Sequence, residues 1–330
     1  MPEGPEVRKF ADEVDSVLTG RVIRSFEART REARNWLVDN GARLFGRRVL
    51  SVRSHGKHLV GQIEGPFYFH SHLMMWGRWH TFVPDPPPDI DRRERARVVV
   101  EGGAAIMYSG PIFNVGEGEA RGHVEHLQML GPDVLPYEGG FDEAEFRRRL
   151  QGPEYRDLTI GAALLNQRIV AGLGNYLRAE VLFACGLNPW TKVGQMKKRE
   201  VTCLSRIVPE LALRSYLFGA TASDNDRERM KTDPSLVYQQ GRKMGTRHLV
   251  FRRTNLPCLR CSRPIKQLRQ TTFDDRTLPG SLDRPLSQSP AQAGKGTDAE
   301  RSRIIYFCAQ CQQVEPLPAA ASAVVGSTPK

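Results

Sequence analysis

The chain has 330 residues, of which 40% are hydrophobic, and this is enough for two or three domains with their own cores. Its 48 Lys and Arg residues outnumber its 37 Asp and Glu residues, giving a net charge of +11 and an isoelectric point near 9.6. This balance points to a polyanionic partner, usually nucleic acid, although a merely solvated basic surface has the same composition. The sequence has no run of about 18 apolar residues and no basic segment followed by an apolar core at its start, so we expect neither a membrane span nor a secretory signal.

The chain begins with the sequence MPEGPE. Removal of Met1 would leave the secondary amine of Pro2 beside the carboxylate of Glu3. Because an α-amino group titrates near pH 7.7–8.0 (about 10.4 for lysine), part of this amine is unprotonated at neutral pH. Such an amine is a candidate nucleophile toward a sugar C1′ or an aldehyde, with a covalent iminium as product, and Glu3 is placed to move protons. The ordinary alternative is that Pro5 simply begins a helix.

Helical spacing of apolar residues from Pro5 to Thr19, closed by Gly20, predicts a helix that would anchor the amine at its own start. From about residue 21 to residue 108 the pattern changes to short alternating or β-branched runs broken by Gly and Pro, which is typical of an antiparallel sandwich or barrel. The expected strands cover residues 21–26, 47–53, 58–63, 68–70, 78–82, 97–101 and 104–108. The sequence PDPPPD at 84–89 predicts an exposed loop.

Two short segments of this region carry candidate functional side chains. The sequence SHGKH at 54–58 predicts a hairpin turn with Lys57 at its tip, where a lysine is ordinarily just solvated. The sequence HLMMWGRW at 72–79 is dense in large flexible and aromatic side chains. A sandwich core is the usual place for such residues, but a wedge that enters a base stack needs the same apolar bulk on a short loop beside cationic groups.

A linker is predicted at GPD (131–133) and YEGG (137–140), after which helices are expected over 141–151, 158–170, 176–185 and 197–217. The second and third of these helices are joined by a Gly-rich turn that ends in Asn175, the expected N-cap. Free N–H groups at such a helix start bind phosphate well, although a plain helical hairpin is the commoner outcome. Residues 221–247 are charged and weakly patterned and predict a loop.

The six cysteines divide into two groups. Four of them form two C-x-x-C pairs: Cys258, Cys261, Cys308 and Cys311. Four thiolates at this spacing suit one tetrahedral zinc ion with no open position, hence a structural ion. The two isolated cysteines, Cys185 and Cys203, are expected to be small core residues, and this usage suggests a reducing cytoplasm.

The segment between the two cysteine pairs is unusually long for a zinc finger. Residues from about 272 to 299 are rich in Pro, Ser, Gln, Gly and Asp and predict a disordered insertion. The remainder predicts a β-hairpin ending in arginines, in which Arg303 either binds a phosphate or is merely exposed. Residues 313–330 are expected to form a disordered tail.

Three motifs now stand in a fixed order: PEGPE at the start, LNQRIVAGLGNY at 165–176 and the paired C-x-x-C finger. Together they resemble the formamidopyrimidine-DNA glycosylase and endonuclease VIII family, over residues 1 to about 312 apart from the finger insertion. The resemblance implies an α+β protein of several domains. These are an antiparallel β-sandwich with a flanking helix (1–135), a helix–two-turn–helix domain (136–252) and a zinc-finger β-hairpin (253–312).

The resemblance also implies a bifunctional enzyme of base excision repair, acting as a cytoplasmic monomer on double-stranded DNA that contains oxidised bases or abasic sites. The Pro2 amine would attack C1′ of a flipped nucleotide, displace the damaged base, and open the strand by β- and δ-elimination. The sequence GLGNYLR at 172–178 is closer to the endonuclease VIII branch, which favours oxidised pyrimidines. The other branch, which removes 8-oxoguanine and formamidopyrimidines, is the alternative.

Site roles follow from the resemblance by position. Pro2 matches the nucleophile and Glu3 matches the acid/base that assists ring opening and base departure. Glu6, grouped with the DNA-binding residues, matches a buried carboxylate that supports the N-terminus. Lys57 matches a hairpin-tip lysine that contacts the phosphate next to the lesion.

The remaining matches concern DNA contacts. Asn175 and Arg303 match two residues that clamp phosphates flanking the flipped nucleotide, with Arg301 as the competitor of Arg303. The loop that fills the void left by the flipped base contains Met74, Met75 and Trp76, any one of which would intercalate.

Two other classes of protein compete with the glycosylase hypothesis. A non-catalytic DNA-binding protein would keep the helical turn and the finger, and loss of Pro2 or Glu3 would signal it; neither is lost. A zinc-ribbon partner protein without DNA contact fits the finger but leaves the net charge of +11 and the Asn175 turn unexplained.

Overall fold

The computed structural model describes residues 2–83, 91–238, 245–272 and 302–314. The predicted loop at 84–89, Arg301, nearly all of the predicted insertion and the tail after residue 314 lie outside the described residues. The chain divides into two compact units, Met1–Gly140 and Phe141–Lys330, and each is described by itself. Within the described ranges, no helix is both long enough and apolar enough to cross a membrane.

The first unit contains two four-stranded antiparallel sheets, which confirms the predicted α+β class with a β-sandwich. One sheet has the order β2-β3-β4-β8: Val49–His55, His58–Ile63, Phe67–His72 and Ile112–Glu117. The other has the order β1-β6-β7-β5: Ile23–Ala28, Glu94–Val100, Gly103–Tyr108 and Arg78–Phe82.

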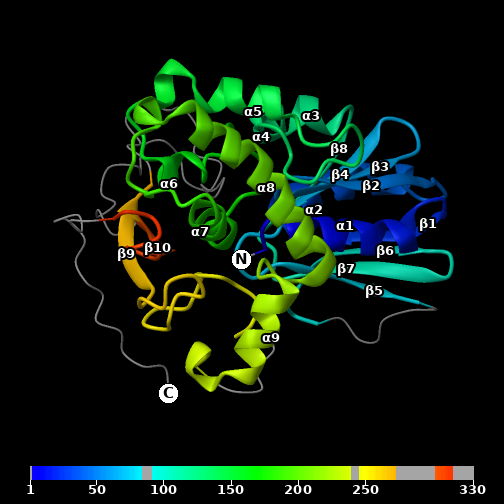
Figure 1. Cartoon of the computed structure of the whole chain (residues 1–330). Coiled ribbons are helices and arrows are strands. Elements are labelled where there is room, and N and C mark those ends of the chain that lie inside the picture. Colours follow the sequence, from blue (N-terminus) through cyan, green and yellow to red (C-terminus); the bar gives the residue numbers. More distant parts are fainter. Residues whose placement is uncertain (1, 84–90, 239–244, 273–301, 315–330) are drawn as a thin grey trace. The chain divides into compact units, whose positions relative to one another are not determined.

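Helix α1, Gly4–Leu18, lies between these two sheets (Figure 1) and packs against β2 of one sheet and β5 of the other. Its apolar positions at helical spacing, including Val7, Val14 and Leu18, are buried in one core with the aromatic side chains of the strands. Burial of each such side chain stabilises the fold by about 1.5–3 kcal/mol. The helix, and the chain start that precedes it, are therefore held firmly.

Five described elements of the first unit, four helices and one strand, were not predicted. Helix α2, Arg31–Asn40, followed by the short 3-10 helix η1, Gly41–Arg43, is mostly polar and buries only Ala33 fully, so its helical period is weak. Strand β8 follows the last predicted strand after a short turn, and only two of its side chains are fully apolar and buried, Phe113 and Val115. The helices α3, Ala120–His123, and α4, Glu125–Met129, complete the unit.

The second unit consists of helices and a β-hairpin (Figure 1). Helix α7 packs against α8 and against the hairpin strand β10. The described helices of the second unit are α5 Glu143–Leu150, η2 Pro153–Tyr155, α6 Ile160–Ala163, α7 Asn175–Ala184, η3 Val193–Gln195, α8 Lys198–Phe218, α9 Asp224–Thr232 and η4 Pro234–Leu236. Its described strands are β9 Lys266–Thr271 and β10 Ser302–Phe307.

The predicted helix over 158–170 is wrong beyond Ala163, because polar side chains take over the backbone bonds there. The Asn166 side chain accepts from the Arg168 backbone N–H at 2.9 Å and bends the chain into a turn. The predicted loop over 221–247 is also wrong in part, because α9 and η4 lie within it. Ser223 caps α9 by accepting from the Asp226 N–H at 3.1 Å, but the helix is so polar that its period was not evident.

The prediction that Cys185 and Cys203 are separate core residues is wrong. The two cysteines form a disulfide with a Cα–Cα distance of 5.9 Å, and both are only partly buried. Cys185 lies at the C-terminus of α7 and Cys203 lies in the second turn of α8, so the bond ties these two packed helices together. The two cysteines are 18 residues apart in the sequence, and this separation does not indicate that they lie close together in the fold.

Candidate catalytic and DNA-binding site

Pro2 and Glu3 directly precede the first turn of α1. Glu3 is the N-cap residue and is only 2% exposed, whereas Pro2 is half-buried. The Glu3 backbone N–H donates to Glu6 Oε2 at 2.9 Å, which is one half of a capping box. The resemblance implied a buried carboxylate at Glu6, and this is wrong, because Glu6 is partly exposed.

Lys57 lies in the turn between β2 and β3, where His55 and His58 form the last strand pair. The turn has two residues, Gly56 and Lys57, and Gly56 has a φ of +57°, a conformation that side-chain-bearing residues rarely adopt. The position agrees with the predicted hairpin tip. The side chain is only 3% exposed, however, so the ordinary solvated turn lysine is excluded.

Asp133 is a buried carboxylate that the sequence analysis placed in a linker and gave no role. It accepts the Leu135 N–H at 3.0 Å and a backbone bond from Gly56, next to Lys57. Burial raises the pKa of the Asp133 carboxyl, against the opposing effect of nearby His55 and Arg8. Arg8 of α1 donates to the Leu135 carbonyl at 3.1 Å, so the segment 133–135 contacts both α1 and the Lys57 turn. The GPDVL sequence could have indicated this buried carboxylate, because the aspartate has apolar neighbours on both sides.

The loop after β4 presents the predicted wedge residues. Leu73 is buried and anchors the loop, and the Gly77 N–H donates to the Leu73 carbonyl at 2.8 Å to close it. Met75 is 59% exposed and Trp76 is 78% exposed, so these two apolar side chains project from the loop. Met74 is partly buried and has a φ of +51°.

Three buried histidines, one at the start of β3 and two on β4, lie beside the base of this loop. His58 Nδ1 lies 2.9 Å from His70 Nε2, and the rings of His58 and His72 pack edge to face with centroids 4.7 Å apart. His72 Nδ1 accepts the Met74 N–H at 3.2 Å. The histidines therefore connect the strand that follows Lys57 to the base of the loop.

In the second unit, the Gly-rich turn before α7 is held by one buried amide. Gln167 Oε1 accepts the Gly172 N–H at 3.0 Å, and Gln167 Nε2 donates to the Leu173 carbonyl at 2.9 Å. Gly172 has a φ of +108°, which favours glycine. The prediction that Asn175 is the N-cap is wrong: Gly174 is the N-cap and Asn175 is the first helical residue.

Arg303 lies on β10 opposite Gln270 of β9, and its side chain is exposed. Gln270 is buried and its Nε2 donates to the Pro189 carbonyl at 2.9 Å. A Cβ at Gly161 would lie 2.2 Å from Gln270 Oε1, so only glycine at the start of α6 admits this side chain. The hairpin that carries Arg303 is thus fixed against the helices of the same unit.

Two buried charged residues of α7 were missed by the sequence analysis, Arg178 and Glu180, each fully buried. Arg178 bonds to Asn175 and to the Ile304 carbonyl of β10. Glu180 accepts three consecutive backbone N–H groups, at residues 249–251. Both could have been recognised from the sequence, because each is a charged residue within an otherwise apolar stretch of the helix.

The four paired cysteines come together as predicted. Their sulfur atoms all lie within 4.8 Å of one another, with Sγ–Sγ distances of 3.8 Å for Cys258 and Cys311 and 3.4 Å for Cys261 and Cys308. A zinc ion bound at about 2.3 Å from four thiolates requires sulfurs about 3.8 Å apart, so the donor set fits a closed tetrahedral metal site.

The surroundings of this cysteine cluster attach it to α7. Arg260 Nη1 donates to the Phe183 carbonyl at 2.9 Å, which satisfies a terminal carbonyl of that helix. Gln312 accepts the Cys308 N–H at 2.9 Å and donates to the Leu187 carbonyl at 2.8 Å.

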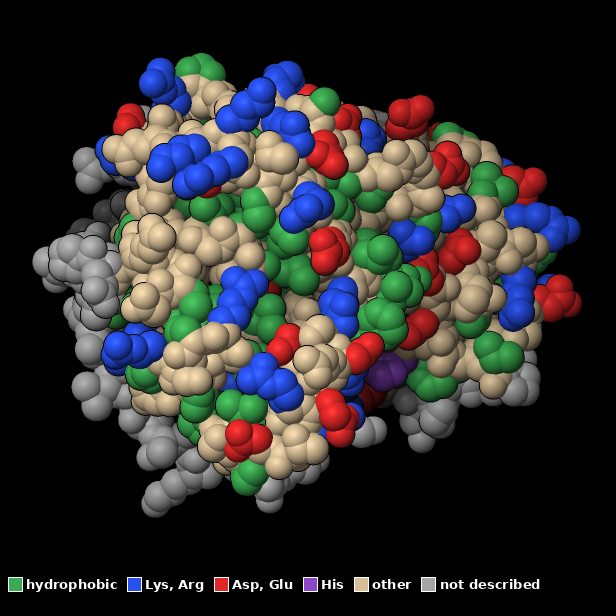
Figure 2. Space-filling view, viewed as in Figure 1, with side chains coloured by type: hydrophobic (Ala, Val, Ile, Leu, Met, Phe, Trp, Pro, Cys, Tyr) green, Lys and Arg blue, Asp and Glu red, His purple; other side chains and the backbone are tan. Residues whose placement is uncertain are grey.

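Surface charge alone does not locate the DNA contact. On the face drawn in Figure 2, Lys and Arg side chains are interspersed with Asp and Glu side chains and with apolar side chains. The assignment of a DNA surface therefore depends on individual residues such as Asn175 and Arg303 rather than on the net charge of +11.

The fold and these residues define a class of DNA glycosylases. The protein-family model of the formamidopyrimidine-DNA glycosylase N-terminal domain matches residues 1–111. The family model of the formamidopyrimidine-DNA glycosylase H2TH domain matches residues 130–223. The chain belongs to the formamidopyrimidine-DNA glycosylase and endonuclease 8 family.

Two curated relatives of this chain are endonuclease 8 proteins. A probable endonuclease 8 of Streptomyces coelicolor is 31% identical over 301 residues, which are 89% of this chain and 95% of that protein. Endonuclease 8 of Pectobacterium carotovorum is 30% identical over 225 residues, 68% of this chain and 83% of that protein. The fold is that of Lactococcus lactis formamidopyrimidine-DNA glycosylase bound to DNA with an abasic site, with a TM-score of 0.68, 22% identity, and coverage of 94% of this chain and 99% of that one.

Proposed function

We propose that this DNA glycosylase is bifunctional and excises oxidised bases, chiefly pyrimidines, through an iminium formed on Pro2, and then cleaves the strand as an abasic-site lyase. The observation that carries the proposal is the chain start: a proline whose amine becomes terminal on loss of Met1 precedes a carboxylate that is 2% exposed, at the head of a buried helix. A helix N-terminus also lowers the pKa of a nearby amine, because its dipole disfavours positive charge there.

The chemistry assigned to these residues proceeds in two parts. The Pro2 nitrogen forms a bond to C1′ as the glycosidic bond to the damaged base breaks, and Glu3 supplies a proton as the sugar ring opens. Loss of the C2′ proton then breaks the C3′–O bond, and a second elimination breaks the C5′–O bond. Hydrolysis of the iminium returns the free amine.

Lys57, Asn175 and Arg303 would bind the phosphates around the flipped nucleotide. Exposure of the Arg303 guanidinium on β10 supports this role, and no hydrogen bond or ion pair of its side chain occurs among the described residues. Met75 and Trp76 project from their loop and would fill the space left by the flipped nucleotide, with Met74 as the partly buried base of this wedge.

A single structural zinc ion would be held by Cys258, Cys261, Cys308 and Cys311. The ion would fix the finger and thereby the hairpin that presents Arg303. The enzyme would act as a monomer on chromosomal DNA in the cytoplasm.

The substrate class is supported by the relatives of this chain. Endonuclease 8 proteins among the relatives favour oxidised pyrimidines as the substrate class, while the 8-oxoguanine and formamidopyrimidine branch of the family is the second candidate. The test is cleavage of otherwise identical duplexes that carry an oxidised pyrimidine, 8-oxoguanine or an abasic site. Faster release of the oxidised pyrimidine by at least tenfold is expected, and preference for 8-oxoguanine would reverse the substrate assignment.

A non-catalytic DNA-binding protein would give a different pattern. It would bind the abasic duplex, with an affinity that falls steeply as salt rises, but it would cleave none of the three duplexes.

A further inference from the structure

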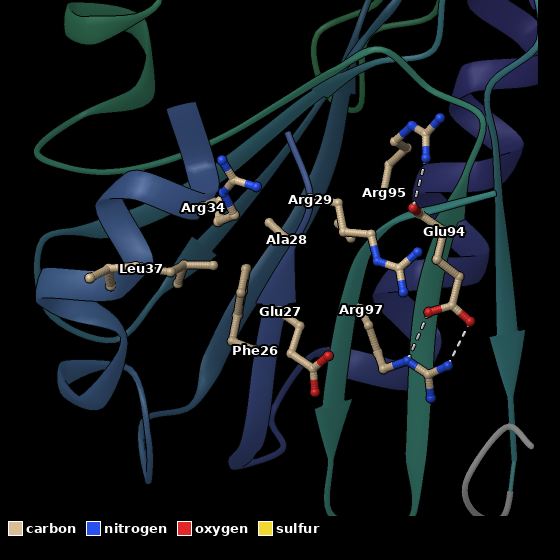
Figure 3. Close-up of a pocket in the computed structure, with 11 residues that line it drawn as sticks. Phe26, Glu27, Ala28, Arg29, Arg34, Leu37, Glu94, Arg95 and Arg97 are labelled. Atoms are coloured by element: carbon tan, nitrogen blue, oxygen red, sulfur yellow. Dashed lines mark hydrogen bonds and ion pairs between the residues drawn. The ribbon is translucent and has the colours of Figure 1, made fainter. Parts of the chain in front are cut away.

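A groove lies beside strand β1, which forms one edge of its sheet. It consists of two cavities that share Phe26. The first has a volume of about 310 Å³ and lies between β1, α2 and the start of β6 (Figure 3). The second has a volume of about 380 Å³ and extends toward η1 and Phe45. We call the two cavities together the β1 groove, and none of the residues proposed above for catalysis or DNA binding lines it.

The strand beside this groove has an open backbone edge. The Arg29 N–H donates to the Arg95 carbonyl at 2.8 Å, across the end of the β1–β6 ladder. Since bonded residues alternate along an antiparallel strand, Phe26 and Ala28 direct their N–H and C=O groups away from β6. Among the described residues, no element pairs with this edge at Phe26 or Ala28. An open edge of this kind accepts an added extended peptide.

Three guanidinium groups line the first cavity without a carboxylate partner. Among the described residues, Arg29 donates only to the Asp91 carbonyl, at 3.4 Å, and Arg95 donates only to the carbonyls of Arg92 and Glu94, at 3.3 and 3.1 Å. Within the described ranges, no carboxylate lies within 4.0 Å of Arg29, Arg34 or Arg95. Figure 3 shows these arginines around the cavity, together with Arg97, whose charge is balanced by Glu94, and with Glu27, so that four arginines and two glutamates line the cavity. Their excess of positive charge is complementary to carboxylates.

The groove also offers apolar contact beside these charges. Val38 on α2 is 80% exposed and Phe45 is 65% exposed, and they line the first and second cavity respectively. Phe26 packs its ring against Phe69 and Phe113, with centroids 5.9 and 6.1 Å away, so it is tied to the aromatic core of the first unit. Single-stranded nucleic acid is normally bound by stacking next to cationic groups, whereas the open strand edge matches a peptide backbone.

We propose that the β1 groove binds an extended acidic peptide segment of a partner protein. The peptide backbone would pair with Phe26 and Ala28, aspartate or glutamate side chains would contact Arg29, Arg34 and Arg95, and an apolar side chain would enter the cavity beside Phe45. Through this contact the partner would bring the glycosylase to sites of repair without occupying the residues that act on DNA.

The test uses the full-length protein and a fluorescein-labelled peptide in which four aspartates are followed by a leucine and a phenylalanine. Fluorescence anisotropy should report binding that weakens at least tenfold when Arg34→Glu and Arg95→Glu are combined, and when the aspartates of the peptide are replaced by asparagine. Arg31→Glu is the matched control, because Arg31 is exposed on the same helix α2 but lines neither cavity, and it should change the affinity less than twofold.

Cleavage of an abasic duplex by the Arg34→Glu/Arg95→Glu variant should equal that of the unaltered protein, which shows that the fold is intact. Absence of peptide binding up to about 1 mM, or equal weakening by Arg31→Glu, would overturn the proposal. If the affinity for an oligothymidine of similar length falls in the variant and peptide binding does not, the groove binds nucleic acid instead.

Discussion

Arg178 and Asn175 are joined by a 2.6 Å hydrogen bond from Arg178 Nη2 to Asn175 Oδ1 in the first turn of α7. The same nitrogen donates to the Ile304 carbonyl at 3.0 Å, directly after Arg303 in β10. Arg178 Nη1 bonds to the Gly161 carbonyl at 3.1 Å. One buried guanidinium thus helps to position the two proposed phosphate-binding residues of the second unit, Asn175 through its side chain and Arg303 through its strand.

We therefore expect Arg178→Lys to weaken binding of an abasic duplex at least tenfold, because an ammonium group cannot reach all of these acceptors in the fixed planar geometry of a guanidinium. The loss on Asn175→Ala should be smaller in the Arg178→Lys background than in the unaltered protein, since the two residues act as one unit. Dissociation constants of the four proteins measure this coupling. Additive losses would show that Arg178 does not position Asn175, and exposed Arg206→Lys on α8 is the control.

Glu180 organises the segment that follows α9. Its carboxylate accepts the backbone N–H groups of Leu249, Val250 and Phe251 at 2.7–2.9 Å, and also the Thr221 hydroxyl. Glu180→Gln would set an amide N–H₂ against these donors and should lower the free energy of unfolding by about 2–3 kcal/mol. Urea unfolding measures the change. Glu210→Gln, at an exposed position of α8, should change it by less than about 0.5 kcal/mol, and an equal effect of both substitutions would contradict this role for Glu180.

His248 makes the stability of the second unit depend on pH. Burial lowers the pKa of its imidazole, against the raising effect of the Glu180 carboxylate, while the ring packs against Tyr176 and Phe251. Since the unfolded state takes up a proton at a higher pH than the folded state does, this stability is fully present above about pH 6.5 and is lost as the pH falls toward the lowered value. The loss is at most about 1.4 kcal/mol per pH unit, and less because the ring is partly exposed.

Urea midpoints between pH 7.5 and pH 5.5 test this dependence. His248→Gln should flatten the decline, because glutamine has no proton to take up in this range. The same decline in the variant would assign the pH dependence to another group.

Metal removal should affect DNA binding through the finger. The purified protein is expected to contain one zinc ion per chain, and Cys258→Ser should lower both the zinc content and the affinity for duplex DNA, because the hairpin that carries Arg303 loses its anchor. Elemental analysis and binding titrations measure the two quantities. Joint replacement of Cys185 and Cys203 by serine removes sulfur from elsewhere in the same unit and should leave the zinc content unchanged. Full DNA affinity without metal would contradict the role given to the finger.

The sequence was sufficient for those features whose pattern is local. The helix after Pro2, the two-residue turn at Lys57 and the cysteine pairs each follow from residues close together in the chain. Helix α2 and helix α9 were missed because their polar sequences hide the helical period, although Ser223 before α9 is an ordinary cap.

The interior contacts of the site could not be predicted, because they join distant residues. Arg178 reaches a carbonyl 126 positions away, and Glu180 reaches backbone groups about 70 positions away. Asn175 was expected to cap α7 with its own side chain, but Gly174 takes that position and the Asn175 side chain turns to Arg178 instead. That bond spans only three residues, but Arg178 is held there by its bonds to the carbonyls of Gly161 and Ile304, which local propensity does not reveal.

The central claim, that the Pro2 amine is the nucleophile, is tested most directly by borohydride reduction of the protein on an abasic duplex, followed by mass spectrometry of the digested adduct. We expect a covalent adduct on the N-terminal peptide that begins with Pro2, and at least a hundredfold less adduct for Pro2→Gly at equal DNA binding. An adduct on a lysine such as Lys57, or no adduct despite tight binding, would contradict it.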